Sequence, residues 1–197
     1  MRAFVTGGTG FIGSHLVELL VNCGYQVTCT VRETSNLQWL QPLLAGKLPR
    51  IQLVTADLSN PDSPIPSLWR IDLVFHLAGL TQAFNANEYN RANAEATRRL
   101  VEACVAENGS IKRFLYCSSL AACGPSQDGK PVSEDAQPQP LTDYGRSKLH
   151  GEIIIREYVH SLPITIIRPP AVSERAVGET YFLTDGVVQS WWDGIEI

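Results

Sequence analysis

The sequence predicts an α/β fold in which a doubly wound parallel sheet carries helices on both faces. Three observations predict it. Short apolar segments with strand character alternate along the chain with longer segments that have an apolar face at helical spacing. A glycine-rich turn between Thr6 and Gly13 joins the first strand to the first helix. Small residues at Ala78-Gly79 follow a later apolar strand.

Composition and charge exclude some classes of protein. The chain has 197 residues, enough for one domain with a substantial core, and 44% of them are hydrophobic and 18% charged. A net charge of −4 gives no basic footprint for nucleic acid, and no apolar run is long enough to span a bilayer. Because the first strand begins at Arg2, no signal peptide is expected, and the predicted location is the cytoplasm.

The five cysteines are an odd number and contain no C-x-x-C pair. They are interpreted as reduced thiols in or near the core, and metal ligation is the less favoured interpretation. No metal site is therefore predicted at Cys23, Cys29, Cys104, Cys117 or Cys123.

The first strand is predicted from the apolar run Ala3 to Val5, which is typical of a strand covered on both faces. The following glycines permit a close approach that a side chain would block, and the apolar face from Phe11 to Leu20 begins a helix. Backbone N–H groups and the positive helix end then meet at one place, which predicts a pyrophosphate site, with an ordinary turn as the alternative. The residues predicted to bind a dinucleotide here are Thr6, Gly7, Gly10, Phe11, Ile12 and Gly13.

A second strand over Tyr25 to Val31 decides the expected cofactor. Val31 takes the place where an acidic side chain would receive the adenosine ribose hydroxyls, and Arg32 follows it. Valine cannot accept a hydroxyl hydrogen bond, whereas Arg32 can pair with a phosphate. NADP(H) is therefore favoured, and NAD(H) remains an alternative because Arg32 could be a solvated strand end and Glu33 could bind the ribose.

The next segments are a predicted helix over Leu37 to Ala45, capped by Ser35 or Asn36, and a third strand over Ile51 to Val54. Asp57-Leu58 follows this strand. The aspartate can meet the adenine there, although a plain turn aspartate explains the pattern equally well.

A fourth buried strand is predicted from Ile71 and runs into the turn Leu77-Ala78-Gly79. Small residues at the carboxyl end of a central strand let a flat cofactor lie against the backbone, so this turn is a predicted cofactor contact. His76 lies inside the apolar strand and is interpreted as a packed, hydrogen-bonded core histidine rather than a base. The remaining predicted elements are a helix over Tyr89 to Asn108, a strand over Ile111 to Cys117, a helix from Asp143 to about His160 and a strand over Ile164 to Ile167.

Three polar residues are predicted to meet beside the cofactor. Ser119 follows the fifth strand, and Tyr144 and Lys148, four residues apart, share one face of the next helix. A phenol has a reference pKa of about 10, and the ammonium of Lys148 is expected to lower it and to bind the nicotinamide ribose. Tyr144 can then exchange a proton with a substrate oxygen that Ser119 also binds. Taken singly, each residue has an ordinary surface or strand-end interpretation.

Five motifs carry a resemblance: Thr6-Gly7-Gly8-Thr9-Gly10-x-x-Gly13, His76-Leu77-Ala78-Gly79, Ser118-Ser119, Tyr144-x-x-x-Lys148 and Arg168-Pro169. Together they resemble the extended short-chain dehydrogenase/reductase superfamily, also called the NAD-dependent epimerase/dehydratase family. The resemblance implies a Rossmann domain in which Ser119, Tyr144 and Lys148 are the catalytic triad and Ser118 adjoins the cofactor. Asn93, in Asn-x-x-x-Thr-x-x-Leu, matches the family's helix asparagine and is implied as a further catalytic residue.

The resemblance also bears on the cofactor and on domain organisation. Val31-Arg32 looks like the dihydroflavonol-reductase and 3-beta-hydroxysteroid-dehydrogenase-like branch, whose arginine there meets the NADP 2′-phosphate. The match implies an NAD(P)-binding domain over residues 1–172 and a reduced or incomplete C-terminal substrate lobe, of which 173–197 is a remnant. Segments of the family pattern are absent around 172–175 and after 197. Cys123 stands where the family has tyrosine and receives no role.

The predicted function is an NADP(H)-dependent oxidoreductase that transfers a hydride between nicotinamide and a carbonyl or secondary alcohol. The first alternative is a nucleotide-sugar epimerase or dehydratase with tightly bound NAD, and the second is a non-catalytic NAD(P)-binding sensor. The expected partner is a small-molecule substrate rather than nucleic acid or membrane. A homodimer through the helices that carry Asn93 and Tyr144 is a further expectation.

Overall fold

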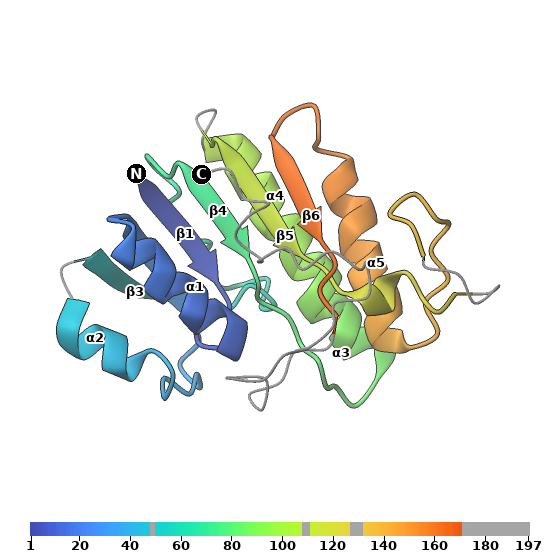
Figure 1. The fold of residues 1–197 in the computed structure, drawn as a ribbon, viewed down its shortest axis with the longest axis horizontal. Helices are drawn as coiled ribbons and strands as arrows, with labels where there is room; N and C mark the ends of the chain where they lie inside the picture. Colours follow the sequence, from blue (N-terminus) through green and yellow to red (C-terminus); the bar gives the residue numbers. More distant parts are fainter. Residues whose placement is uncertain (48–49, 108–110, 127–131, 171–197) are drawn as a thin grey trace.

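Six parallel strands form one sheet in the order β3-β2-β1-β4-β5-β6 (Figure 1). The computed structural model describes residues 1–47, 50–107, 111–126 and 132–170. The strands are β1 (Arg2–Thr6), β2 (Gln26–Val31), β3 (Ile51–Thr55), β4 (Leu73–His76), β5 (Arg113–Cys117) and β6 (Ile164–Ile167). The predicted Rossmann-type sheet is therefore confirmed, whereas the predicted lobe remnant at 173–197 lies outside the described residues.

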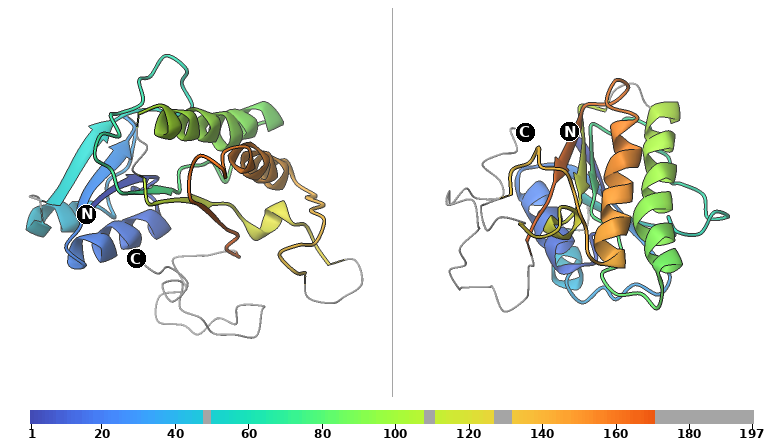
Figure 2. Two further views of the ribbon diagram at one scale, coloured as in Figure 1. Left: turned by 90° about the horizontal axis from the view of Figure 1, so that it is seen from above. Right: turned by 90° about the vertical axis from the view of Figure 1, so that its right-hand side faces the viewer.

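Helices cover both faces of this sheet, and Figure 2 shows α4 and α5 on the face opposite α1. The helical segments are α1 (Phe11–Asn22), α2 (Gln41–Lys47), α3 (Ala86–Asn90), the π-helical turn η2 (Arg91–Glu95), α4 (Ala96–Glu107), the short 3₁₀ turn η3 (Leu120–Ala122) and α5 (Asp143–Arg156). Strand β1 explains the two layers, because alternate side chains point to opposite faces. Phe4 packs in one hydrophobic cluster with α4 and α5, and Ala3 and Val5 pack in the other with α1.

Several element boundaries differ from prediction. The second helix begins at Gln41 instead of Leu37, because residues before it form hydrogen-bonded turns in which Asn36 Oδ1 accepts from the Gln38 N–H. The helix predicted from Tyr89 begins at Ala86, where Asn85 caps it by accepting from the Glu88 N–H. Strands β4 and β5 each begin two residues later than predicted, and α5 ends at Arg156 before a series of turns.

The sheet reverses its winding direction between β1 and β4. In a sheet of this topology, ligands bind outside the carboxyl ends of the strands at such a point. Thr6, at the end of β1, lies opposite His76, at the end of β4. The fold therefore places the glycine-rich turn and the Leu77-Ala78-Gly79 turn beside each other. Within the described ranges, none of the helices combines the length and the apolar character needed to cross a bilayer.

Candidate active site

The glycine-rich turn is shaped by two close backbone approaches. Gly7 has φ +74°, and a Cβ there would lie 2.6 Å from the Ala78 nitrogen of the neighbouring turn. A Cβ on Gly13 would collide with the Gly7 carbonyl oxygen. Gly10 is the N-cap of α1, and no side chain caps this end of the helix. The first-turn N–H groups of α1 are thus left for a ligand, which is the geometry that suits a pyrophosphate.

We expect Gly13→Ala to weaken dinucleotide binding by roughly ten- to a hundredfold, since overpacking against the Gly7 backbone costs about 1–3 kcal/mol. Gly46→Ala is the matched control, because no described atom lies within 4 Å of its Cβ position. Isothermal titration calorimetry with NADPH and NADH measures both variants. Wild-type affinity in Gly13→Ala would place the dinucleotide away from this turn.

A cavity of about 750 Å³ opens where β4, β5 and β6 end and α5 begins. Its volume lies within the range of small-molecule and cofactor sites. Seven of the predicted site residues line it, namely Ile12, Leu77, Gly79, Ser118, Ser119, Tyr144 and Lys148. The rest of its wall is mostly apolar and includes Leu80, Leu120, Ala121, Leu141, Pro169 and Pro170.

The hydroxyl groups of Ser119 and Tyr144 meet in this cavity. Tyr144 lies in the first turn of α5, which Thr142 caps by accepting from the Gly145 N–H at 3.0 Å. Burial raises the pKa of Tyr144, and the hydrogen bond with the Ser119 side chain partly opposes this. The prediction that this pKa is lowered is therefore wrong for the free site: the phenol is protonated at neutral pH.

Lys148 lies on the same face of α5 and is only 3% exposed. Its ammonium lies 4.7 Å from the centre of the Tyr116 ring, and no described residue accepts a hydrogen bond from it. Burial lowers the pKa of Lys148 to about 8. Lys148 is not among the groups that shift the pKa of Tyr144. Its charge adds to the effect of burial in lowering the pKa of His76, and at Cys117 it partly opposes the rise in pKa that burial causes. A buried ammonium without a described acceptor is suited to ligand hydroxyls.

Asn93, for which a catalytic role is predicted, does not line the cavity. It is fully buried in η2, and its Nδ2 donates to the Leu80 carbonyl at 3.0 Å and to Ser147 Oγ at 2.9 Å. Its Oδ1 accepts from the Leu80 N–H at 2.7 Å. Ser147 in turn donates to the Tyr144 carbonyl at 2.7 Å. Asn93 therefore fastens the turn after β4 to the helix that carries Tyr144.

His76 is a core histidine, as predicted. It is fully buried, with Nδ1 2.7 Å from Thr6 Oγ1 and Nε2 2.9 Å from Thr97 Oγ1. Thr97 donates its proton to the Asn93 carbonyl, so its oxygen must accept from His76 Nε2–H. Nδ1 then accepts from Thr6, whose oxygen accepts from the Ala78 N–H at 3.2 Å. This hydrogen-bond chain joins the glycine-rich turn to Asn93. Thr6 takes part in it and does not line the cavity.

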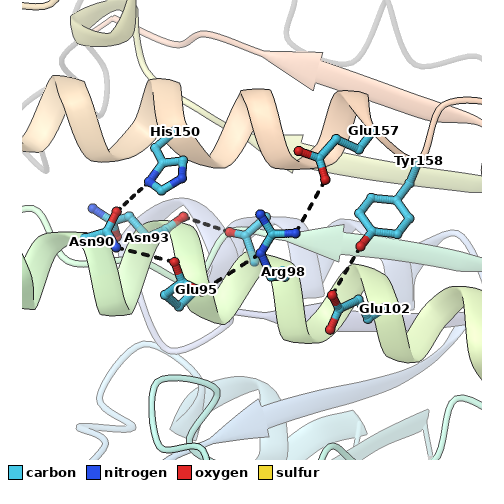
Figure 3. A network of polar contacts seen from close by, with 9 residues as sticks. Asn90, Asn93, Glu95, Arg98, Glu102, His150, Glu157 and Tyr158 are labelled. Carbon is cyan, nitrogen blue, oxygen red and sulfur yellow. Dashed lines mark hydrogen bonds and ion pairs between the residues drawn. The ribbon is translucent and has the colours of Figure 1, made fainter.

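Polar contacts join α5 and the residues after it to α3 and α4 (Figure 3). His150 Nδ1 lies 2.6 Å from Asn90 Oδ1, close to the η2 turn. Further along, Arg98 pairs with Glu157 at 3.4 Å, and Tyr158 donates to Glu102 at 3.2 Å. The helix that positions Tyr144 and Lys148 is thus anchored by polar contacts as well as by its buried residues.

The predicted adenosine contacts lie outside the cavity, at the carboxyl ends of β2 and β3. Arg32 is exposed, its backbone N–H donates to Ser35 Oγ at 2.8 Å, and its charge contributes to the lowered pKa of Asp57. The Asp57 carboxylate accepts from both the Ser59 N–H and the Ser59 hydroxyl, at 2.9 and 2.6 Å. The Leu58 side chain is buried in the core, so a cofactor can meet only its backbone.

Sequence reasoning missed Arg99 on α4. Its guanidinium donates to four carbonyl oxygens of the loop after β3, those of Leu58, Asn60, Pro61 and Ser63. Nothing in the sequence pattern indicates this, because the contacts join positions about forty residues apart. Arg99 therefore shapes the edge on which Asp57 lies.

Comparison with known proteins identifies the family. The sequence model of the NAD dependent epimerase/dehydratase family matches residues 3–177. The chain belongs to this family. It is 35% identical over 185 residues to an uncharacterised UDP-glucose epimerase, YtcB, of Bacillus subtilis. The match covers 85% of this chain and 55% of that relative. It is 31% identical to dihydroflavonol 4-reductase of Hordeum vulgare, covering 75% of this chain and 43% of the relative.

A solved structure agrees with this assignment. UDP-glucuronic acid 4-epimerase from Bacillus cereus in complex with NAD superposes with a TM-score of 0.73 and 32% identity, covering 86% of this chain and 56% of that chain. The epimerase/dehydratase-family chain thus spans about half the length of the relatives that it matches. Family membership makes NAD(P) the expected class of cofactor.

Proposed function

We propose that this chain binds NADP(H) and carries out oxidoreduction at the carbonyl or carbinol carbon of a small molecule, with Tyr144 as the acid–base group. The observation that carries the proposal is the cavity itself. It brings together the hydrogen-bonded hydroxyls of Ser119 and Tyr144 and the buried ammonium of Lys148. A phenol that is hydrogen-bonded to a serine, one helical turn from a cation without an acceptor among the described residues, suits the protonation of a substrate oxygen.

Each group has a distinct proposed role. Tyr144 gives its proton to the substrate oxygen in reduction and receives it in oxidation, while Ser119 hydrogen-bonds the same oxygen. Lys148 binds hydroxyls of the nicotinamide ribose, which supply the acceptors that its ammonium lacks among the described residues. When bound, the dinucleotide supplies the hydride acceptor or donor. Gly7, Gly10 and Gly13 hold its pyrophosphate.

The preference for NADP(H) rests on the end of β2. Val31 ends the strand without a hydrogen-bond acceptor in its side chain, and the exposed guanidinium of Arg32 is available for a 2′-phosphate. The similarity to dihydroflavonol 4-reductase supports the reductase reaction. An epimerase is the second candidate, because the Bacillus cereus structure with NAD is an epimerase.

The protein is expected to bind NADPH at least about tenfold more tightly than NADH, since a charge-assisted hydrogen bond is worth about 1.5–3 kcal/mol. Arg32→Glu is expected to reverse this order. Fluorescence titration with each dinucleotide measures the four dissociation constants. Glu33→Gln is the control, and it tests whether Glu33 binds the ribose instead. An unchanged order in Arg32→Glu would remove the basis for NADP(H).

The state of the cofactor separates reductase from epimerase. A reductase must exchange its dinucleotide at every turnover, so the purified protein should contain little of it and should consume NADPH with a carbonyl substrate. An epimerase keeps its dinucleotide between half-reactions. Stoichiometric NAD in the purified protein, with no net consumption of NADPH, would favour the epimerase.

A further inference from the structure

A buried ion pair joins three of the elements that surround the cavity. Glu152 on α5 is 1% exposed, and Arg168, directly after β6, donates to its two oxygens at 2.8 and 2.6 Å. Ser118, directly after β5, donates its hydroxyl to Glu152 Oε1 at 2.5 Å. The Glu152 carboxylate therefore links α5 to the ends of β5 and β6. Its hydrogen bonds with Arg168 raise the pKa of the Arg168 guanidinium.

Each member of this group adjoins a residue of the proposed site. Ser118 directly precedes Ser119. Glu152 lies one helical turn after Lys148 and two turns after Tyr144, so the three share one face of α5. Arg168 precedes Pro169, which lines the cavity and accepts from the Leu120 N–H at 2.9 Å. The ion pair is thus built into the elements that carry the hydroxyls of Ser119 and Tyr144.

The hydroxyl of Ser118 was predicted to adjoin the cofactor, but its proton is committed to Glu152. A buried carboxylate is costly unless it is paired and hydrogen-bonded. Replacing such a pair by apolar residues is often neutral for stability, so stability alone does not account for it. The remaining guanidinium nitrogen of Arg168, Nη1, donates to the Glu134 carbonyl at 3.4 Å. This contact connects the loop before α5 to the same ion pair.

We propose that Glu152 and Arg168 are positioning residues that set the separation between Ser119 on the β5 side and Tyr144 on α5. In the proposed function both hydroxyls bind the substrate oxygen, so the catalytic consequence rests on that function. The geometric consequence does not, because the contact exists in the protein without substrate. A purely structural ion pair would lower stability when removed and leave this contact unchanged.

The test observes Tyr144 directly, by ¹³C NMR of protein labelled at tyrosine Cζ, with Tyr144→Phe assigning the signal. The hydrogen bond with Ser119 lowers the pKa of Tyr144, so Ser119→Ala defines the signal and titration of the lost contact. Glu152→Gln is expected to move the Tyr144 signal and its pKa toward those of Ser119→Ala. Glu157→Gln is the matched control, since it removes an exposed pair with Arg98 near the end of the same helix and should leave Tyr144 unchanged.

Arg168→Lys provides a second variant in case Glu152→Gln does not fold. It keeps the charge and loses the two-pronged geometry, so it should produce a smaller shift in the same direction. In turnover assays, both variants should lower kcat by about tenfold or more and leave the NADPH dissociation constant unchanged.

Two outcomes decide the proposal. A wild-type Tyr144 signal in both variants, accompanied by a lower melting temperature, would show that the ion pair is only structural and would overturn it. A shifted signal supports the positioning role whatever the reaction is. If the signal shifts but Tyr144→Phe keeps full turnover, the proposed function fails and the positioning role stands.

Discussion

Replacing Tyr144 with phenylalanine is expected to lower kcat by about 10²- to 10⁴-fold, the usual contribution of a positioned acid–base group. The ring still fills its half-buried place at the start of α5, and the Thr142 cap is unaffected because Gly145 supplies the donor. The dissociation constant of NADPH should therefore stay within about twofold of wild type, since the glycine-rich turn and Lys148 remain.

Two controls sharpen this experiment. Tyr89→Phe changes a tyrosine whose ring centroid lies 6.0 Å from that of Tyr144. Its hydroxyl donates to the Thr81 carbonyl, so this variant should keep most of the activity. Ser119→Ala should lower kcat and further raise the pKa of Tyr144, because the opposing hydrogen bond is lost. Turnover that survives in Tyr144→Phe would leave another group as the proton donor.

The raised pKa of Tyr144 also gives the proposed reaction a direction in the free site. A protonated phenol is ready to give a proton to a substrate oxygen, as carbonyl reduction requires. Oxidation requires the phenolate, so the pH optimum for alcohol oxidation should lie above that for carbonyl reduction. Lys148, with its pKa at about 8, loses its charge over the same alkaline range.

The fold and the geometry of the glycine-rich turn could be predicted because their signals are local. The strand pattern of residues 3–5 and the spacing of Gly7, Gly10 and Gly13 follow from backbone geometry within one supersecondary unit. The interpretation of His76 also needed only its apolar neighbours. Each of these predictions depends only on residues close together in the sequence. For His76, the structure adds the identity of its hydrogen-bond partners, Thr6 and Thr97.

The contacts that the sequence does not reveal join distant segments. Asn93 matched a catalytic motif, yet its amide is occupied by Leu80 and Ser147, which lie 13 and 54 positions away. The prediction that Lys148 lowers the pKa of Tyr144 is wrong because helical spacing shows that two residues share a face, but it does not show where a long side chain points. Glu152 did have a signal, since it continues the Tyr144 and Lys148 face by one more turn, but its partner Arg168 appears only in three dimensions.

Acid is expected to destabilise this protein through His76. Burial, together with the charge of Lys148, lowers the pKa of His76 from 6.5 to about 3. Between these two values the unfolded chain binds a proton at this position that the native state does not bind. The free energy of unfolding contributed by His76 is therefore complete above pH 6.5 and falls as the pH drops toward 3, with a loss of about 1.5 kcal/mol already between pH 6.5 and pH 5.

The hydrogen-bond chain explains why the native state resists this proton. Nε2 carries the ring proton because Thr97 donates to Asn93, so Nδ1 accepts from the Thr6 hydroxyl. A second proton on the ring would occupy Nδ1 and take away the acceptor of the Thr6 hydroxyl. The same proton would therefore separate the turns after β1 and β4. Dinucleotide affinity should fall along with stability as the pH is lowered, since the glycine-rich turn depends on that junction.

Urea denaturation at pH 8, 6.5 and 5 measures the effect, with His76→Gln as the comparison. Glutamine keeps a donor and an acceptor but does not titrate, so this variant should be less stable than wild type at pH 8 and lose about 1.5 kcal/mol less between pH 6.5 and pH 5. His160→Gln, which changes an exposed histidine, should retain the wild-type loss. Equal losses of unfolding free energy in wild type and His76→Gln would mean that native His76 takes up the proton. The direction assigned to the hydrogen bonds from Thr6 through His76 to Asn93 would then be wrong.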